Sequence, residues 1–194
     1  MTGRETGAVT TDRAGVARLL HRIGWSLIVG CAWLWVGDRY YTVAPVAAVV
    51  GGFSLLQLGD LLDDRRAVTL LRWAAISSGA AAVVAAVVAL RPTVAGIGVA
   101  GAGSGPWPVL LAATVPVSLY ALAMASWVGR TSPALAGRFR WSVAAWLVGL
   151  AVSVVVVLPG ALLTFAAYIL LAGSHHVVKT TMRELAAEDR RVPV

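Results

Sequence analysis

The chain has 194 residues, of which 59% are hydrophobic and only 13% are charged, and its mean hydropathy is +0.81. Soluble domains carry roughly 25% charged residues, so this composition excludes an ordinary water-soluble fold. The formal net charge of +7 would suggest nucleic acid as the partner of a soluble protein. Here the basic residues flank apolar stretches, so we expect a lipid bilayer as the partner and no nucleic acid.

Long uncharged stretches, separated by ionisable residues or by a Gly-rich loop, predict an all-α polytopic membrane bundle of six helices. Residues 1–22 are expected to be a cytoplasmic, partly interfacial segment, and residues 177–194 a cytoplasmic tail. Apolar residues at helical spacing in that tail could bind a partner helix, but they favour a position on the membrane surface. The transmembrane domain, 23–176, is expected to contain helices at about 23–37, 43–59, 70–90, 107–128, 141–158 and 160–176.

The last uncharged run decides the number of helices. It covers residues 141–174, about 50 Å as a single helix, whereas the hydrocarbon core is about 30 Å thick. Pro159 and Gly160 lie near its middle, and proline lacks the backbone donor that a helix interior needs. We therefore expect a tight turn at these two residues, with a short helix on each side.

The basic residues predict the orientation. With six helices, fourteen Lys and Arg residues share one side with both chain ends, and only Arg39 and Arg91 lie on the other. With a single helix over residues 141–174 the split would be ten against six. Cytoplasmic loops carry the excess of Lys and Arg, so both ends are expected in the cytoplasm of a multi-pass cell-membrane protein.

Three hairpins of similar length indicate an internal repeat. Arg lies directly or shortly before Trp at the start of each hairpin, and Pro follows at each expected outer turn. The Trp-to-Pro spacings are 20, 19 and 18 residues, and a Gly expected to end the return helix lies 14 residues after the Pro in the first and third hairpins. These residues are Arg22, Trp25, Pro45 and Gly59; Arg72, Trp73 and Pro92; and Arg140, Trp141, Pro159 and Gly173.

This pattern, over residues 20–178, resembles the HdeD-type family of small six-helix membrane proteins. The resemblance implies a link to acid stress, and it carries no signature site residue. A Gly-rich stretch at residues 96–105 stands where that family usually has a tight outer turn.

An acidic loop is the first candidate site. Asp60, Asp63 and Asp64 resemble an aspartate-rich motif that binds Mg²⁺ and diphosphate, because hard cations prefer clustered carboxylates. That chemistry needs a second acidic cluster facing the first, and the remaining cluster, at residues 184–189, is in the C-terminal tail. A solvated loop, neutralised by the following arginines, is the interpretation we favour.

Three histidines form the second candidate site. His21, His175 and His176 are expected near the cytoplasmic ends of the first and sixth helices, where they would meet if those helices are neighbours. They could then bind a metal or haem. We favour plain interfacial histidines, and we therefore predict no cofactor and no metal.

No ionisable residue lies near any expected helix centre, which disfavours a self-sufficient ion-coupled transporter. Small residues, as in 79–89, would hold the helices together. We expect a non-enzymatic membrane protein with a structural, stress-response or accessory role, as a homo-oligomer or in a membrane complex. The alternative is the solute-binding membrane subunit of a transporter energised by a separate partner.

Overall fold

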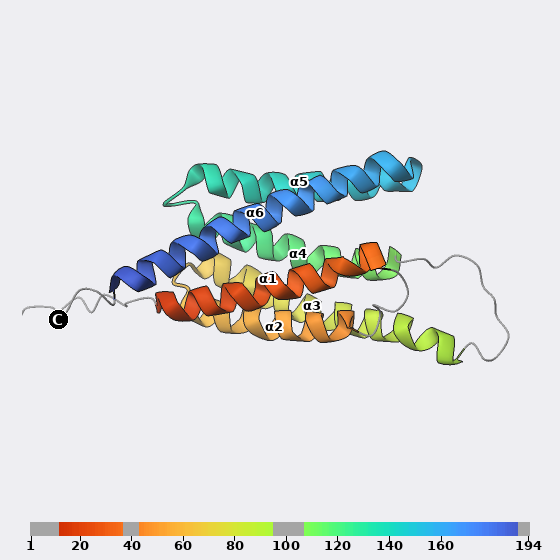
Figure 1. The fold of residues 1–194 in the computed structure, drawn as a ribbon, viewed down its shortest axis with the longest axis horizontal. Coiled ribbons are helices and arrows are strands. Elements are labelled where there is room, and N and C mark those ends of the chain that lie inside the picture. The colour runs from red at the N-terminus through yellow and green to blue at the C-terminus, as the bar shows by residue number, and fades with distance from the viewer. Residues whose placement is uncertain (1–11, 37–42, 95–106, 190–194) are drawn as a thin grey trace, which may run out of the picture.

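The computed structural model describes residues 12–36, 43–94 and 107–189, which are almost entirely helical (Figure 1). No strand occurs in these ranges, so the predicted all-α fold class is confirmed. The helices are α1 (Arg13–Val36), α2 (Ala44–Leu61), α3 (Arg65–Val94), α4 (Trp107–Val128), α5 (Pro133–Val155) and α6 (Val157–Asp189).

Five of these helices, α2 to α6, are long and apolar enough to cross a membrane. Helix α1 was predicted to cross as well, but its side chains are described only up to residue 29. The helices present large apolar side chains outwards, such as Phe53, Ile76 and Leu162, each at least 60% exposed. An apolar outer surface suits lipid, where helices satisfy their own backbone groups. The chain is therefore a helical membrane protein.

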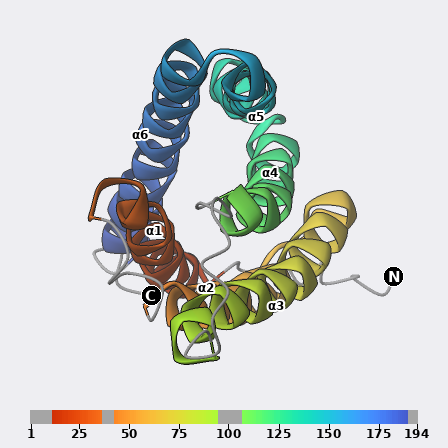
Figure 2. The ribbon, with the colours of Figure 1, turned by 90° about the vertical axis from the view of Figure 1, so that its right-hand side faces the viewer.

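The helices form a ring in chain order (Figure 2). Each helix packs on the next along the chain, and contacts between α1 and α6 close the ring. The main apolar core includes residues from all six helices and contains Leu20, Leu58, Leu71, Met124 and Phe139, all nearly inaccessible to solvent.

Small residues bring α5 and α6 into close contact. A Cβ atom on Gly149 would lie 2.7 Å from the backbone nitrogen of Thr164. A Cβ on Gly160 would lie within 3 Å of the backbone of Ser153. Glycine at both positions lets the two backbones approach, as is common between membrane helices.

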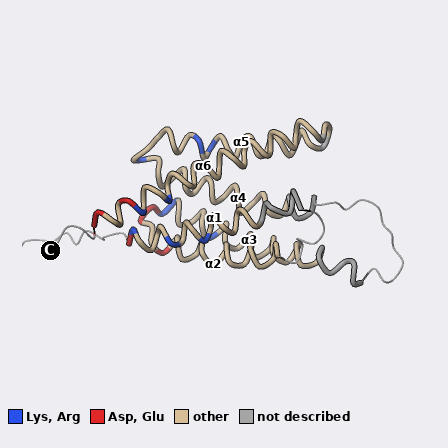
Figure 3. The backbone as a smooth tube through the Cα atoms, in the orientation of Figure 1, with Lys and Arg blue, Asp and Glu red and all other residues tan. Residues whose placement is uncertain are grey.

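The described Lys, Arg, Asp and Glu residues lie mostly toward one end of the bundle (Figure 3). At that end Arg13, the first residue of α1, bonds the carboxylate of Asp189, the last residue of α6, at 3.1 Å. The two ends of the described chain therefore lie side by side. Trp25, Trp73 and Trp141 are more than half exposed and follow an arginine by three residues, one residue and one residue, as in an interfacial aromatic belt.

The described helices extend beyond the bounds predicted for the membrane-spanning segments. Helix α1 begins at Arg13 and not at residue 23, and α6 runs through Gly173 to Asp189 and not to residue 176. Helices α3 and α5 also begin before the expected 70 and 141. The predicted bounds stopped near charged residues, but arginine is a good helix former and does not end a helix outside the membrane.

The apolar residues of these extensions pack inside the protein. Val16 and Leu20 of α1 and Val178 of α6 are buried in the main core, and Ala186 is buried too. The apolar faces of these extensions of α1 and α6 are therefore covered by other parts of the bundle.

The turn between the last two helices is three residues earlier than predicted. Helix α5 ends at Val155, Val156 is extended, and α6 already begins at Val157. Pro159 is thus in the first turn of α6, where the missing amide hydrogen costs no helical hydrogen bond. Pro92 lies in the last turn of α3, so the prolines of the predicted repeat differ in position, and the repeat remains a prediction.

Candidate functional site

The acidic loop between α2 and α3 caps a helix. Asp60 and Asp63 are exposed, whereas Asp64 is buried directly before α3. The Asp64 carboxylate accepts hydrogen bonds from the backbone amides of Arg66, at 2.9 Å, and Ala67, at 3.2 Å. Asp64 is therefore the N-cap of α3, and it satisfies amides that have no partner inside the helix.

The same carboxylate joins α3 to α4. Its second oxygen accepts a hydrogen bond of 3.2 Å from the Ser126 hydroxyl. Burial favours the neutral form, but the amides of Ala67 and Arg66, the Ser126 hydroxyl and the charge of Arg130 together lower the pKa of Asp64 below its ordinary value of 3.8. Asp64 thus carries its charge in the folded protein at neutral pH.

Among the described residues, the acidic side chains of the C-terminal tail form no metal-binding group with those of the loop between α2 and α3. Glu184 and Glu188 are exposed on α6, and Asp189 bonds Arg13. In the parts of the chain that the structure describes, no group of three His, Cys, Asp or Glu side chains is placed to hold a metal ion. The described acidic side chains therefore act as a cap, an ion pair and solvated surface groups.

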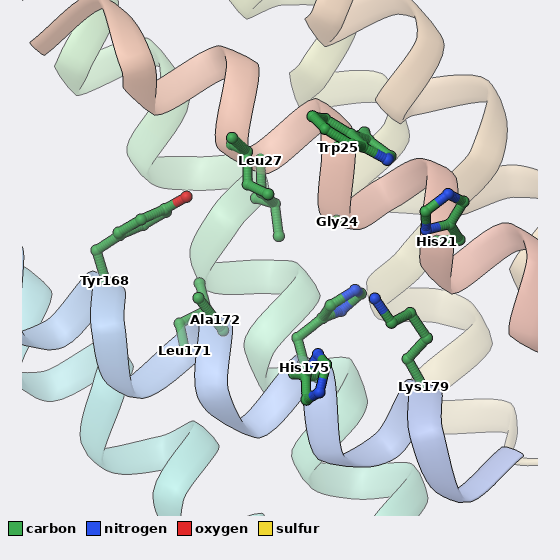
Figure 4. Close-up of a pocket in the computed structure, with 11 residues that line it drawn as sticks. His21, Gly24, Trp25, Leu27, Tyr168, Leu171, Ala172, His175 and Lys179 are labelled. Carbon is green, nitrogen blue, oxygen red and sulfur yellow. The ribbon is translucent and has the colours of Figure 1, made fainter. Parts of the chain in front are cut away.

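The three candidate histidines do come together, in a groove between α1 and α6 with a volume of about 190 Å³ (Figure 4). His21 is exposed on α1, and its ring meets that of Trp25 edge to face. His175 and His176 come from α6, and Lys179 lies one turn beyond them. The lining includes no Asp or Glu, so the groove has a basic end without a carboxylate.

His175 was predicted near a helix end, but it lies inside α6 and is only 5% exposed. Its Nδ1 atom shares a 2.5 Å hydrogen bond with the hydroxyl of Tyr120, a buried residue of α4. A Cβ on Gly24 of α1 would lie 2.8 Å from Nε2 of His175. The imidazole is thus held between α4 and α1.

The other ring nitrogen of His175, Nε2, makes no hydrogen bond to a described residue. Nε2 is buried and has no partner with acceptable geometry among the described residues, although the Leu20 carbonyl interacts with the ring. In the tautomer that accepts the Tyr120 proton at Nδ1, the imidazole carries its own proton on Nε2. His175 then offers a buried N–H donor beside the groove.

The groove changes from basic to apolar along its length. Figure 4 shows His21 and Lys179 towards one end and Tyr168 at the other. Lys179, His176 and His21 are close enough to His175 to affect it electrostatically. Away from them the walls are apolar, formed by side chains that include Leu27, Ile28, Leu171 and Ala172. Such a lining suits an amphiphile with an anionic head.

Sequence reasoning found these histidines but not the partner of His175. Tyr120 is 55 positions away, and the sequence showed it only as one of a few polar residues in an apolar stretch. A signal exists in hindsight: Gly24 of α1 leaves space for a large side chain on a neighbouring helix.

Comparisons of the chain with protein-family models, with curated proteins and with solved structures each found no match. They leave the resemblance to the HdeD-type family untested.

Proposed function

We propose that this chain is a non-enzymatic integral protein of the cell membrane with a structural or accessory role. Both ends of the chain are in the cytoplasm in this proposal, because the end of the bundle that holds Arg13 and Asp189 also holds most of the basic side chains.

The observation that carries the proposal is how the bundle interior uses its polar groups. Buried hydroxyls donate to carbonyls of their own helices: Ser54 to Val50, Ser153 to Gly149, Thr164 to Gly160 and Ser174 to Leu170, at 2.7–2.9 Å. Such bonds satisfy the hydroxyl locally. These four hydroxyls thus serve packing, and this supports a structural role.

A stress-response role and self-association extend this proposal. The resemblance to the HdeD-type family suggests acid stress as the condition. The apolar outer surface is compatible with a homo-oligomer or a membrane partner, because helices in lipid associate through close packing of such surfaces.

The test is purification of the tagged full-length protein in a mild detergent, with mass spectrometry of everything that co-purifies in stoichiometric amount. Recovery of the protein alone, or with a second non-enzymatic membrane protein, supports the proposal. A recurrent ATPase, or saturable binding of a small solute, would contradict it and favour the transporter subunit. Unchanged acid survival of a deletion strain would remove the stress-response part.

A further inference from the structure

We propose that the groove between α1 and α6 binds one anionic phospholipid, with its phosphate at the basic end and an acyl chain along the apolar end. This site does not depend on the accessory role, because it rests only on the groove and its lining.

The basic end fits a phosphate. Lys179, His21 and His176 lie around the buried ring of His175, and no carboxylate lines the groove. The buried Nε2 atom of His175 has no hydrogen-bond partner among the described residues, and it is a donor in the tautomer whose Nδ1 accepts the Tyr120 proton. A buried donor without a partner is costly, and a phosphate oxygen would satisfy it.

The direction of the groove fits a lipid. Because Arg13 at the start of α1 contacts Asp189 at the end of α6, the two helices run antiparallel. His21 and Lys179 therefore lie nearer to these charged helix ends, and Ile28 and Tyr168 lie farther from them. Trp25 and Ile28 line the groove and are 57% and 50% exposed, so the groove is open towards the lipid phase. A head group at the interface and a chain beside α1 would follow this direction.

We assign the groove to a phospholipid and not to a free phosphate ion. A free phosphate would leave the apolar half of the groove without a bound group. Burying apolar surface contributes about 25 cal/mol per Å², which favours an occupant with an acyl chain. Clusters of basic residues at the cytoplasmic face also meet anionic head groups there.

The experiment is native mass spectrometry of the full-length protein, released from micelles that contain phosphatidylglycerol and phosphatidylcholine with the same acyl chains. We expect one retained lipid per chain, with at least fivefold preference for phosphatidylglycerol. Lys179→Gln should weaken retention of phosphatidylglycerol by roughly fivefold or more, since one basic residue near a membrane surface has about that effect. Arg72→Gln is the matched control, because it removes the same charge from an exposed site on α3, and it should retain the lipid as before.

Two further measurements identify the occupant. His176→Gln, at an exposed position, should also weaken retention, which keeps the test independent of folding defects at buried His175. Inorganic phosphate and glycerol phosphate, added at millimolar concentration, should not displace the lipid. Displacement by either would show a site for a soluble phosphate and overturn the lipid assignment. Equal effects of Lys179→Gln and Arg72→Gln, or equal retention of both lipids, would overturn the site itself.

Discussion

Replacing Gly149 with Ala places a methyl group where α6 already lies. The new Cβ would be 2.5 Å from the hydroxyl oxygen and 2.7 Å from the backbone nitrogen of Thr164. Ordinary van der Waals contact begins near 3.4 Å, so the backbone of α6 must move by about 0.7 Å. A backbone nitrogen in a helix cannot rotate aside as the tip of a side chain can, so the whole α5–α6 interface has to adjust.

The cost of this overpacking is about 1–3 kcal/mol. Alanine also favours the helix over glycine by up to about 1 kcal/mol, which partly offsets the cost. Gly79→Ala separates the two effects, because a Cβ on Gly79 of α3 meets nothing within 4 Å. The difference between the two variants therefore isolates the packing cost, which for a chain of this size corresponds to a Tm difference of roughly 4–8 °C for about 2 kcal/mol.

The assay is thermal unfolding in a mild detergent, followed by circular dichroism and by loss of the monodisperse peak in size-exclusion chromatography. Gly149→Ala should unfold below the wild type, and Gly79→Ala at or above it. Equal Tm values for the two variants would refute the close contact between α5 and α6.

Three further predictions use the same unfolding assay. Asp64→Ala should cost about 1 kcal/mol at pH 7, because it removes the N-cap of α3. The pKa of Asp64 is lowered on folding, so its stabilisation is full above the ordinary value of 3.8 and is lost as the pH falls through the lowered pKa. If the Tm difference between Asp64→Ala and the wild type does not become smaller in acid, this account of Asp64 is wrong. Tyr120→Phe should cost about 1–3 kcal/mol, because it leaves Nδ1 of buried His175 without a partner, and an unchanged Tm would argue against that bond. Arg13→Gln should cost less than about 1 kcal/mol, because its bond to Asp189 is solvent-exposed, and a larger loss would mean that this pair anchors the helix ends.

The sequence predicted the helix class and the number of helices well, because charge interrupts apolar stretches where chains leave a bilayer. Pro159, in the last uncharged run, correctly indicated two helices. It lies in the first turn of α6, however, and not in the turn between the helices. Helix ends were predicted poorly at the charged side. Helices α1 and α6 continue beyond the predicted bounds, and the apolar residues of their extensions pack in the common core, which is a tertiary effect.

The candidate site was predicted only in part. The histidines were identified as a possible meeting point of the first and sixth helices, and the groove does bring them together. The burial of His175 and its bond to Tyr120 depend on how α4 approaches α6, which no local pattern indicates. The role of Asp64 as a cap depended on where α3 begins, and the predicted start at residue 70 hid it.

The predicted orientation is tested most directly by labelling single cysteines on either side of α4 in intact cells. Cys31, the only native cysteine, is first replaced by Ala. A cysteine at Ser132, between α4 and α5, should be protected from an impermeant thiol reagent until the membrane is permeabilised. A cysteine at Ser104, which lies outside the described residues, should react at once. Labelling of Ser132→Cys in intact cells, with protection of Ser104→Cys, would contradict the assignment of both chain ends to the cytoplasm.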